Sequence, residues 1–277
     1  MDLTVIIPCK DHHRRLVKLL ETIPQNVAVI VVENNSKHPV EQLNNYLEST
    51  FPNVKTYISH AKGPGGARNL GMEVLETEWF TFADADDLFL PNFSDALKLY
   101  DDEVEADLIA FPPMVTMAGR QDLNQKLMAD LKQLMTAPHL QDYRAKWVVP
   151  WSRFYRKSIV VEHELIFQDL EISEDVSFAM QYNVYAKRIL FSELVIYLNQ
   201  VGKKSRYSDL SSSQIVMDTE VRRWQAKFVF EKYGIKLWRY PFYSKIRFAL
   251  QQAKKSHHIK IFWQLLQILF QSTDREG

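Results

Sequence analysis

The chain has 277 residues, 46% hydrophobic and 25% charged, which suits one large α/β domain or one domain with a modest appendage and excludes wholesale disorder. Its 34 basic and 34 acidic residues give a net charge of zero, which disfavours a generic binder of nucleic acids or other polyanions. The single cysteine, Cys9, excludes an intrachain disulfide framework and a thiolate zinc site, and fits a reducing compartment.

The first part of the chain alternates short apolar runs with helical patterns. Leu3–Ile7 and Val27–Val32 are nearly continuous β-branched runs, as buried parallel strands require, and His12–Ile23 between them has apolar residues at helical spacing. The elements expected next are a helix at Pro39–Leu47, a strand at Val54–Ile58, a helix after Gly66, a strand at Trp79–Ala83, a helix from Pro91 to Tyr100 and a strand at Asp107–Phe111. This alternation predicts a doubly wound, mostly parallel sheet, in which ligands bind beyond the carboxyl ends of the strands.

The following part, from Pro112 to Lys157, is less regular and contains one helix candidate at Leu123–Met135. A helix is expected at Glu174–Ala186 and strand material at Ile189–Leu198.

Past Ser205 the composition changes, because Lys, Arg and aromatic residues crowd together from Val221 to Phe270. Two or three helical segments are expected there, with a hinge near Trp238–Pro241. We therefore predict an α/β domain over residues 1–205 and a helical region over residues 206–277.

Neither end of the chain has a pattern typical of a membrane span. The apolar run at the N-terminus is too short for a signal peptide, and Ile259–Phe270 is too short and too polar to cross a bilayer. We expect a cytoplasmic protein, at the inner face of the membrane if its C-terminal basic and aromatic helices lie on an anionic surface. The alternative to helices on a membrane surface is a helical appendage that packs on the main domain.

The most distinctive chemical feature is the acidic run Asp84-Ala85-Asp86-Asp87, directly after a predicted strand. Crowded carboxylates repel one another unless a cation neutralises them, and Mg²⁺ or Mn²⁺ prefers such oxygen ligands. The end of a strand is where a doubly wound sheet binds its ligands. The run therefore predicts a divalent metal site, with an ordinary acidic loop as the alternative.

Four further segments fall at predicted strand ends or helix starts. Pro8–Asp11 ends the first strand, and Glu33–Ser36 ends the second, where polar side chains suit either a nucleobase edge or an ordinary turn. Gly63–Asn69 places bare backbone amides and Arg68 at a helix start, which suits either a pyrophosphate or a plain loop. Asp175, after Ser173 and Glu174 at another helix start, is a candidate general base, although a helix cap with favourable acids explains it too.

Taken in order, these segments resemble the inverting glycosyltransferases of family 2, which have the GT-A fold. The segments that carry the resemblance are Val5–Asp11, Val31–Ser36, Gly65–Gly71, Phe82–Asp87, Trp151–Lys157 and Glu174-Asp175. It covers roughly residues 1–200, and the C-terminal quarter lies outside it. One departure is Glu33-Asn34, where the family usually has two aspartates.

The resemblance implies a nucleotide-sugar donor, usually a UDP-sugar, across the ends of the first four strands, and a saccharide, lipid-linked or protein-linked glycan acceptor. It assigns donor binding to Pro8, Asp11, Glu33, Asn35, Arg68, Asp84 and Ala85. It makes Asp86 the ligand of Mg²⁺ or Mn²⁺ and Asp175 the catalytic base, with Glu174 orienting Asp175 or contacting the acceptor. The aromatic residues between Trp147 and Tyr155 either line the acceptor site or pack in the core.

Two other functions fit the sequence less well. A sugar-nucleotide pyrophosphorylase needs a glycine-rich loop with an arginine directly after the first strand, where this chain has Pro8-Cys-Lys-Asp-His12. A non-catalytic, glycosyltransferase-like scaffold subunit would not need costly clustered acids, so Asp84, Asp86 and Asp175 argue against it.

Overall fold

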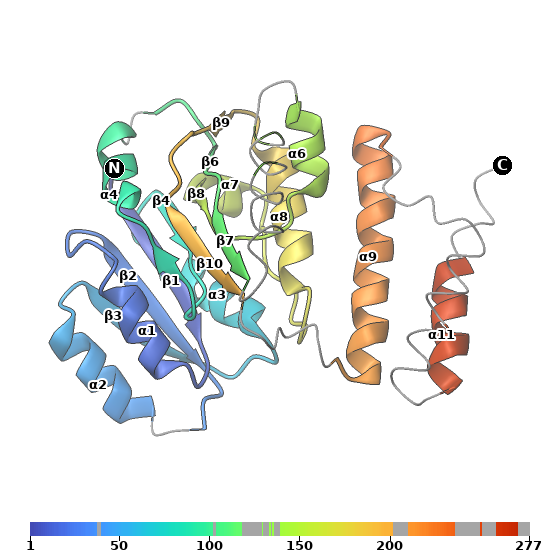
Figure 1. Cartoon of the computed structure of the whole chain (residues 1–277), viewed down its shortest axis with the longest axis horizontal. Coiled ribbons are helices and arrows are strands. Elements are labelled where there is room, and N and C mark those ends of the chain that lie inside the picture. The colour runs from blue at the N-terminus through green and yellow to red at the C-terminus, as the bar shows by residue number, and fades with distance from the viewer. Residues whose placement is uncertain are drawn as a thin grey trace.

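Figure 1 shows the chain as a computed structural model. The residues that it describes are 1–37, 40–101, 104–117, 129, 133, 135, 139–201, 210–235, 250 and 259–270.

A seven-stranded sheet with the order β3-β2-β1-β4-β8-β6-β9 forms the centre of the protein. Its strands are β1 (Leu3–Cys9), β2 (Ala28–Asn34), β3 (Val54–Ser59), β4 (Trp79–Phe82), β6 (Leu108–Ala110), β8 (Arg153–Arg156) and β9 (Ile189–Phe191). All neighbours are parallel except β8, which runs antiparallel to both β4 and β6. The predicted mostly parallel sheet is therefore confirmed.

Helices cover both faces of this sheet, because apolar side chains alternate between the two faces of each strand. One core contains Val5, Ile7 and Val31 under the helices α1 (His13–Leu20), α2 (Val40–Thr50) and α4 (Asn92–Leu99). The other contains Ile6 and Ile30 under the helices α3 (Pro64–Glu73), α6 (Leu140–Lys146) and α8 (Glu174–Tyr185). A short helix, α7 (Lys157–Glu162), follows β8.

A second, three-stranded sheet lies directly after the acidic run. It has the order β5-β10-β7, formed by β5 (Leu88–Phe89), β10 (Tyr197–Val201) and β7 (Met114–Met117). Strand β10 is antiparallel to β5 and parallel to β7. The acidic run therefore connects the large sheet to the small one.

The C-terminal part consists of two described helices, α9 (Ser212–Tyr233) and α11 (Ile259–Phe270), beside the α/β body (Figure 1). Helix α9 packs on α8 and α6, and α11 packs on α9. Among the described residues, no helix is long and apolar enough to cross a bilayer.

The structure differs from the predicted elements at several places. The segment Ile189–Leu198 is two strands, β9 and β10, which belong to different sheets. The predicted elements do not include the strands β5, β7 and β8 or the helices α6 and α7, and α9 begins at Ser212 rather than near Val221. The proposed domain boundary after residue 205 and the hinge near Trp238–Pro241 lie outside the described residues, and the helix at Leu123–Met135 falls on residues described only at isolated positions.

Candidate active site

Arg68 joins two parts of the predicted site that are far apart in the sequence. Its Nη2 lies 2.7 Å from Asp84 Oδ1, and its Nη1 lies 2.9 Å from Glu174 Oε1. Arg68 is only 4% exposed, and its charge is stabilised by the carboxylates around it, which keep the pKa of the guanidinium above its usual value despite burial. The acidic run after β4 and the start of α8 therefore meet at one cation.

Helix α3 brings Arg68 to this position because two of its glycines allow close packing. A Cβ at Gly65 would lie 2.7 Å from the carbonyl oxygen of Gln168 and 3.0 Å from Glu174 Cγ. A Cβ at Gly71 would collide with Ile6 Cγ2 on β1. The helix therefore approaches both the sheet and the segment before α8 more closely than a helix with side chains at these positions could.

The three aspartates of the acidic run have different surroundings. Asp84 and Asp86 keep 33% and 37% of their side chains exposed, and Asp86 Oδ2 lies 3.2 Å from Arg15 Nη1 of α1. Asp87 is buried and accepts hydrogen bonds from the Tyr197 hydroxyl at 2.8 Å, from Asn199 Nδ2 at 3.0 Å and from the Gln200 amide at 2.8 Å. The two exposed carboxylates are thus available to a ligand, whereas Asp87 holds the run against β10.

The Glu174-Asp175 pair begins α8. Ser173, directly before it, has a left-handed backbone with φ of 57° and does not cap the helix with its side chain. Its hydroxyl instead donates to Asp218 Oδ1 of α9 at 2.6 Å. Burial, followed by the charge of Glu174, raises the pKa of the Asp175 carboxyl to about 7, while Arg68 opposes the increase. Such a pKa suits proton transfer near neutral pH.

The predicted nucleoside-side residues gather at the carboxyl ends of β1 and β2, where Pro8 pairs with Val32 in the sheet register. The Asp11 amide donates to Ser36 Oγ at 3.0 Å, and Asp11 Oδ1 accepts from the Lys37 amide at 2.7 Å. Both Asp11 and Asn35 have positive φ values, 57° and 55°. Asn35 Nδ2 donates to the Ala61 carbonyl at 2.7 Å, so tight turns hold this edge of the sheet.

Glu33 lies deeper than the other residues of this group. Its carboxylate is fully buried, where Ser36 Oγ donates to Oε2, and His13 Nε2 of α1 lies 3.6 Å from Oε1. Asn34 faces the other side and donates to the Gly63 carbonyl at 2.8 Å, which ties β2 to the start of α3. A base contact by Glu33 stays a prediction, and it requires its present contacts to open.

The structure thus brings Arg68, Asp84, Glu174 and Asp175 into one electrostatic cluster. Pro8, Asp11, Glu33 and Asn35 form a second group at the ends of β1 and β2, and Ala85 is buried within the acidic run. The ion pair with Arg15 links Asp86 to α1, which follows β1. No motif in the sequence indicates Arg15, Tyr197 or Asp218, because their contacts join segments that are distant in the chain.

Asp84 and Asp86 suit Mg²⁺ or Mn²⁺ in their chemistry. They are carboxylates, the hard oxygen donors that these ions prefer, and they remain partly exposed at a strand end. Their nearest cations are arginines, Arg68 and Arg15, which already compensate part of the negative charge.

Of the aromatic residues that were candidates for the acceptor site, Phe154 and Tyr155 are fully buried in the core, as the packing alternative predicts. Trp151 is partly buried and stacks on Tyr197, with ring centroids 5.5 Å apart and planes 15° apart. The Tyr197 hydroxyl contacts Asp87 and accepts a hydrogen bond from the Asp84 amide. Trp151 therefore lies beside the acidic run.

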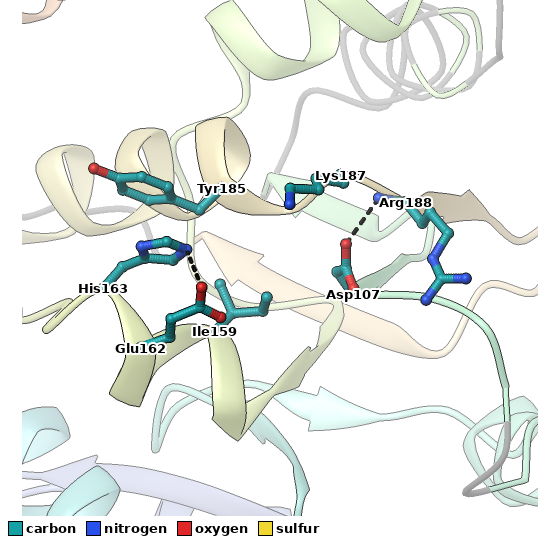
Figure 2. Close-up of a pocket in the computed structure, with 7 residues that line it drawn as sticks. All are labelled: Asp107, Ile159, Glu162, His163, Tyr185, Lys187 and Arg188. Atoms are coloured by element: carbon teal, nitrogen blue, oxygen red, sulfur yellow. Dashed lines mark hydrogen bonds and ion pairs between the residues drawn. The ribbon is translucent and has the colours of Figure 1, made fainter.

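A pocket of about 430 Å³ has a lining that includes none of these residues. Figure 2 shows the side chains that line it. Its lining comes from the ends of α7 and α8 and from the residues before β6 and β9: Asp107, Ile159, Glu162, His163, Tyr185, Lys187 and Arg188. His163 stacks on Tyr185, and the Arg188 amide donates to Asp107 Oδ2 at 2.9 Å. None of the predicted site residues lines this pocket. It lies beside the amino ends of β6 and β9, whereas the predicted site lies at the carboxyl ends of β1, β2 and β4.

A family model described as glycosyl transferase family 2 matches residues 4–162. The putative glycosyltransferase EpsH of Bacillus subtilis is 22% identical over 182 residues, 62% of this chain and 52% of EpsH. The poly(ribitol-phosphate) beta-N-acetylglucosaminyltransferase TarS of Staphylococcus aureus is 24% identical over 199 residues, 68% of this chain and 34% of TarS. The chain thus spans about half or less of the length of these two relatives.

Solved structures share the fold over most of the chain. Residues 1–349 of Staphylococcus aureus TarS in complex with UDP-GlcNAc match with a TM-score of 0.68 at 18% identity, covering 97% of this chain and 80% of that one. The mannosyltransferase PcManGT from Pyrobaculum calidifontis, in complex with GDP-Man and Mn²⁺, matches with a TM-score of 0.53 at 12% identity, covering 98% of this chain and 87% of that one.

Proposed function

This chain belongs to glycosyl transferase family 2, and we propose that it transfers a sugar from a nucleotide-sugar donor, a UDP-sugar, to a hydroxyl group of a saccharide or glycoconjugate acceptor with inversion. The main support for this function is that Arg68 forms ion pairs with both Asp84 and Glu174. It joins the acidic run expected at the donor diphosphate to the helix start that carries the proposed base. The GT-A fold implied by the sequence is confirmed by the structural likeness to TarS.

In the proposed reaction, the Asp175 carboxylate accepts the proton of the acceptor hydroxyl. The acceptor oxygen then forms a bond to the anomeric carbon while the bond from that carbon to the UDP oxygen breaks on the opposite face, which inverts the centre. The carboxylate suits this step because its pKa, raised to about 7 by burial and by Glu174, makes it a competent base at neutral pH. Glu174, held by Arg68, fixes the start of α8 and thereby orients Asp175.

Asp86 and Asp84 would hold the divalent ion. When bound, Mg²⁺ or Mn²⁺ stabilises the negative charge on a departing diphosphate. Pro8, Asp11, Asn35 and Glu33 lie at the ends of β1 and β2, where we place the nucleoside. The choice of a UDP-sugar is supported by the complex of TarS with UDP-GlcNAc, and a metal by the Mn²⁺ complex of PcManGT.

We also propose that the C-terminal helices face an acceptor carried on a membrane surface. Helix α11 buries Ile261 and Leu265 within the cluster that it forms with α9, while Trp263 remains 66% exposed. An exposed tryptophan on a terminal helix suits the boundary between lipid headgroups and acyl chains.

The proposed function is tested by measuring UDP release from a panel of UDP-sugars with Mn²⁺ present. We expect turnover by the wild type and a loss of about 10²-fold or more for Asp86→Ala, because that variant removes a metal ligand at the departing diphosphate. Asp95→Ala, which removes an exposed acid on α4, is the matched control and should behave as the wild type.

Nucleotide binding separates the proposed enzyme from the scaffold alternative. Titration calorimetry with UDP and Mn²⁺ should give a binding signal for the wild type that Asp86→Ala weakens. A wild type that binds no nucleotide at all, whether UDP or GDP, would support the scaffold and contradict the enzyme, whereas binding of GDP alone would contradict only the choice of a UDP-sugar.

A further inference from the structure

A cluster of three potential metal ligands lies beneath the turn that joins β1 to α1. Cys9 ends β1, His13 begins α1, and Glu33 faces Cys9 across the β1–β2 register. The Cys9 sulfur, one imidazole nitrogen of His13 and one Glu33 oxygen all lie within 4.8 Å of one another. The cluster contains none of the residues of the acidic run.

The burial of this cluster leaves part of its charge uncompensated. Cys9 is 1% exposed and Glu33 is fully buried, whereas His13 retains 23% of its side-chain exposure. Ser36 donates to Glu33 Oε2, and the Cys9 thiol also donates to the Glu33 carboxylate. Within the described part of the chain, no nitrogen or hydroxyl donor hydrogen-bonds to Oε1. His13 Nε2 is 3.6 Å from that oxygen, beyond normal hydrogen-bonding distance. A buried carboxylate oxygen in this condition is costly unless a cation reaches it.

We propose that Cys9, His13 and Glu33 bind a transition-metal ion of the Zn²⁺ class. Thiolate, imidazole and carboxylate are the ligands that Zn²⁺ takes, at about 2.0–2.3 Å, so ligand atoms around one ion are about 3.5 Å apart. The observed cluster, whose ligand atoms lie within 4.8 Å of one another, would contract by about 1 Å on binding the ion. The fourth position lies on the His13 side, which is the exposed side, and is filled by water.

The charges of such a site balance. Metal binding displaces the thiol proton of Cys9 to solvent, and the resulting thiolate and the Glu33 carboxylate together offset the two positive charges of the ion. Without metal, burial and the neighbouring Glu33 raise the pKa of the Cys9 thiol, so the thiol stays protonated and unreactive. The expectation that a single cysteine excludes any thiolate zinc site is therefore too broad: it excludes a site made of several thiolates, whereas this mixed site needs only the one cysteine that the chain has.

This site is chemically distinct from the proposed Mg²⁺ or Mn²⁺ site. Asp84 and Asp86 offer only oxygen donors, which suit hard ions, whereas the thiolate and imidazole select Zn²⁺ or Co²⁺ over Mg²⁺. The ion would also fix the edge of the sheet, because Ser36 both donates to Glu33 and accepts from the Asp11 amide. The inference does not depend on sugar transfer, but it replaces the predicted base contact of Glu33, because a bound metal ion would hold that carboxylate in its buried position. The purified full chain tests it without any substrate.

The experiment titrates Co²⁺, a spectroscopic substitute for Zn²⁺, into the full chain with Mg²⁺ in excess. A thiolate ligand gives a sulfur-to-cobalt charge-transfer band in the near ultraviolet, and tetrahedral coordination gives intense visible bands. Because Cys9 is the only cysteine, a charge-transfer band can come from no other side chain. We expect saturation at one Co²⁺ per chain, independent of protein concentration, and loss of both signals when Zn²⁺ is added.

Three variants, checked for folding by circular dichroism, complete the test. Cys9→Ser should abolish the charge-transfer band, and His13→Gln should weaken Co²⁺ binding by at least about tenfold. His12→Gln, an exposed neighbour outside the cluster, is the matched control and should bind as the wild type. No charge-transfer band at saturating Co²⁺, undiminished binding by His13→Gln, or one Co²⁺ per two chains would each overturn the proposal.

Discussion

At the scale of single residues, Arg68 has the most demanding position. Its guanidinium is buried and its two terminal nitrogens contact carboxylates from different segments, a geometry that the planar fork of arginine allows and the point charge of lysine does not. The sequence resemblance places Arg68 on the nucleotide side. In the structure, Arg68 holds Asp84 and Glu174 together through its two ion pairs.

Replacing Arg68 by methionine should therefore destabilise the protein strongly. Arg68→Met keeps a similar volume but leaves the buried Glu174 carboxylate without its cation, which costs about 3–5 kcal/mol. Urea denaturation would measure the change in the free energy of unfolding. Arg15→Met, which breaks the exposed pair with Asp86, is the control and should cost less than about 1 kcal/mol. Equal, small losses for both variants would contradict the role given to Arg68.

The turnover rate should depend on pH through the Asp175 carboxyl group. Burial and the charge of Glu174 raise the pKa of Asp175 to about 7, and a base acts only when deprotonated. Turnover at saturating donor should therefore increase with pH and level off above an apparent pKa near 7. The measurement is initial rate against pH between 5 and 9 with constant ionic strength. A rate independent of pH from 5 to 7 would show that a group with an ordinary carboxyl pKa, or no protein base, limits the reaction.

At the scale of elements, α9 is more than an appendage to the α/β body. Its Val221 and Val229 pack with Val176 and Met180 of α8, and Asp218 accepts the hydrogen bond of Ser173, directly before Glu174 and Asp175. Ser173 is held in a left-handed conformation that non-glycine residues seldom adopt, so its surroundings must stabilise it. Helix α9 thus supports the start of α8.

The hydrogen bond from Ser173 to Asp218 predicts that its loss will change kcat but not the KM for the donor. Asp218→Ala removes the acceptor for Ser173 and should lower kcat about 10- to 100-fold through misplacement of Asp175, with the KM for the donor unchanged. Asp218→Asn retains the acceptor oxygen and should recover most of the rate. Glu220→Ala, at an exposed position of α9, should have no effect. A donor KM that changes as much as kcat would indicate a general loss of structure instead.

The elements that could be predicted from the sequence are those whose signal is local. Strands β1 to β4 and helices α1 and α3 follow from continuous apolar runs, helical spacing and the glycines before Ala67. Strand β8 could not be found in this way, because Arg153 and Arg156 interrupt its pattern, and they are accommodated only by tertiary contacts. Arg153 is buried and donates to Asn183, while Arg156 donates to the carbonyls of Val104 and Ala106.

At the scale of the whole molecule, the sheet topology explains why the site residues meet. The parallel strands β1, β2 and β4 end at one edge, which collects Pro8, Glu33 and the acidic run. The small sheet then holds the acidic run from its far side through Asp87. The Glu174-Asp175 pair arrives from α8, about 90 residues later, which no local pattern places at that edge. Its position at a helix start made Asp175 a candidate base with an equally good structural explanation, and only the family resemblance favoured the functional interpretation.

In the proposed reaction, Asp175 acts on the acceptor while the acidic run acts on the donor. Comparing Asp175→Asn with the wild type in two measurements on the same preparation, the Kd for a UDP-sugar in the presence of Mn²⁺ and the turnover number, separates these roles. We expect a nearly unchanged Kd and a turnover lower by about 10²-fold or more, as is usual for the loss of a general base. Unchanged turnover, or a donor affinity that falls as far as the rate, would contradict these roles.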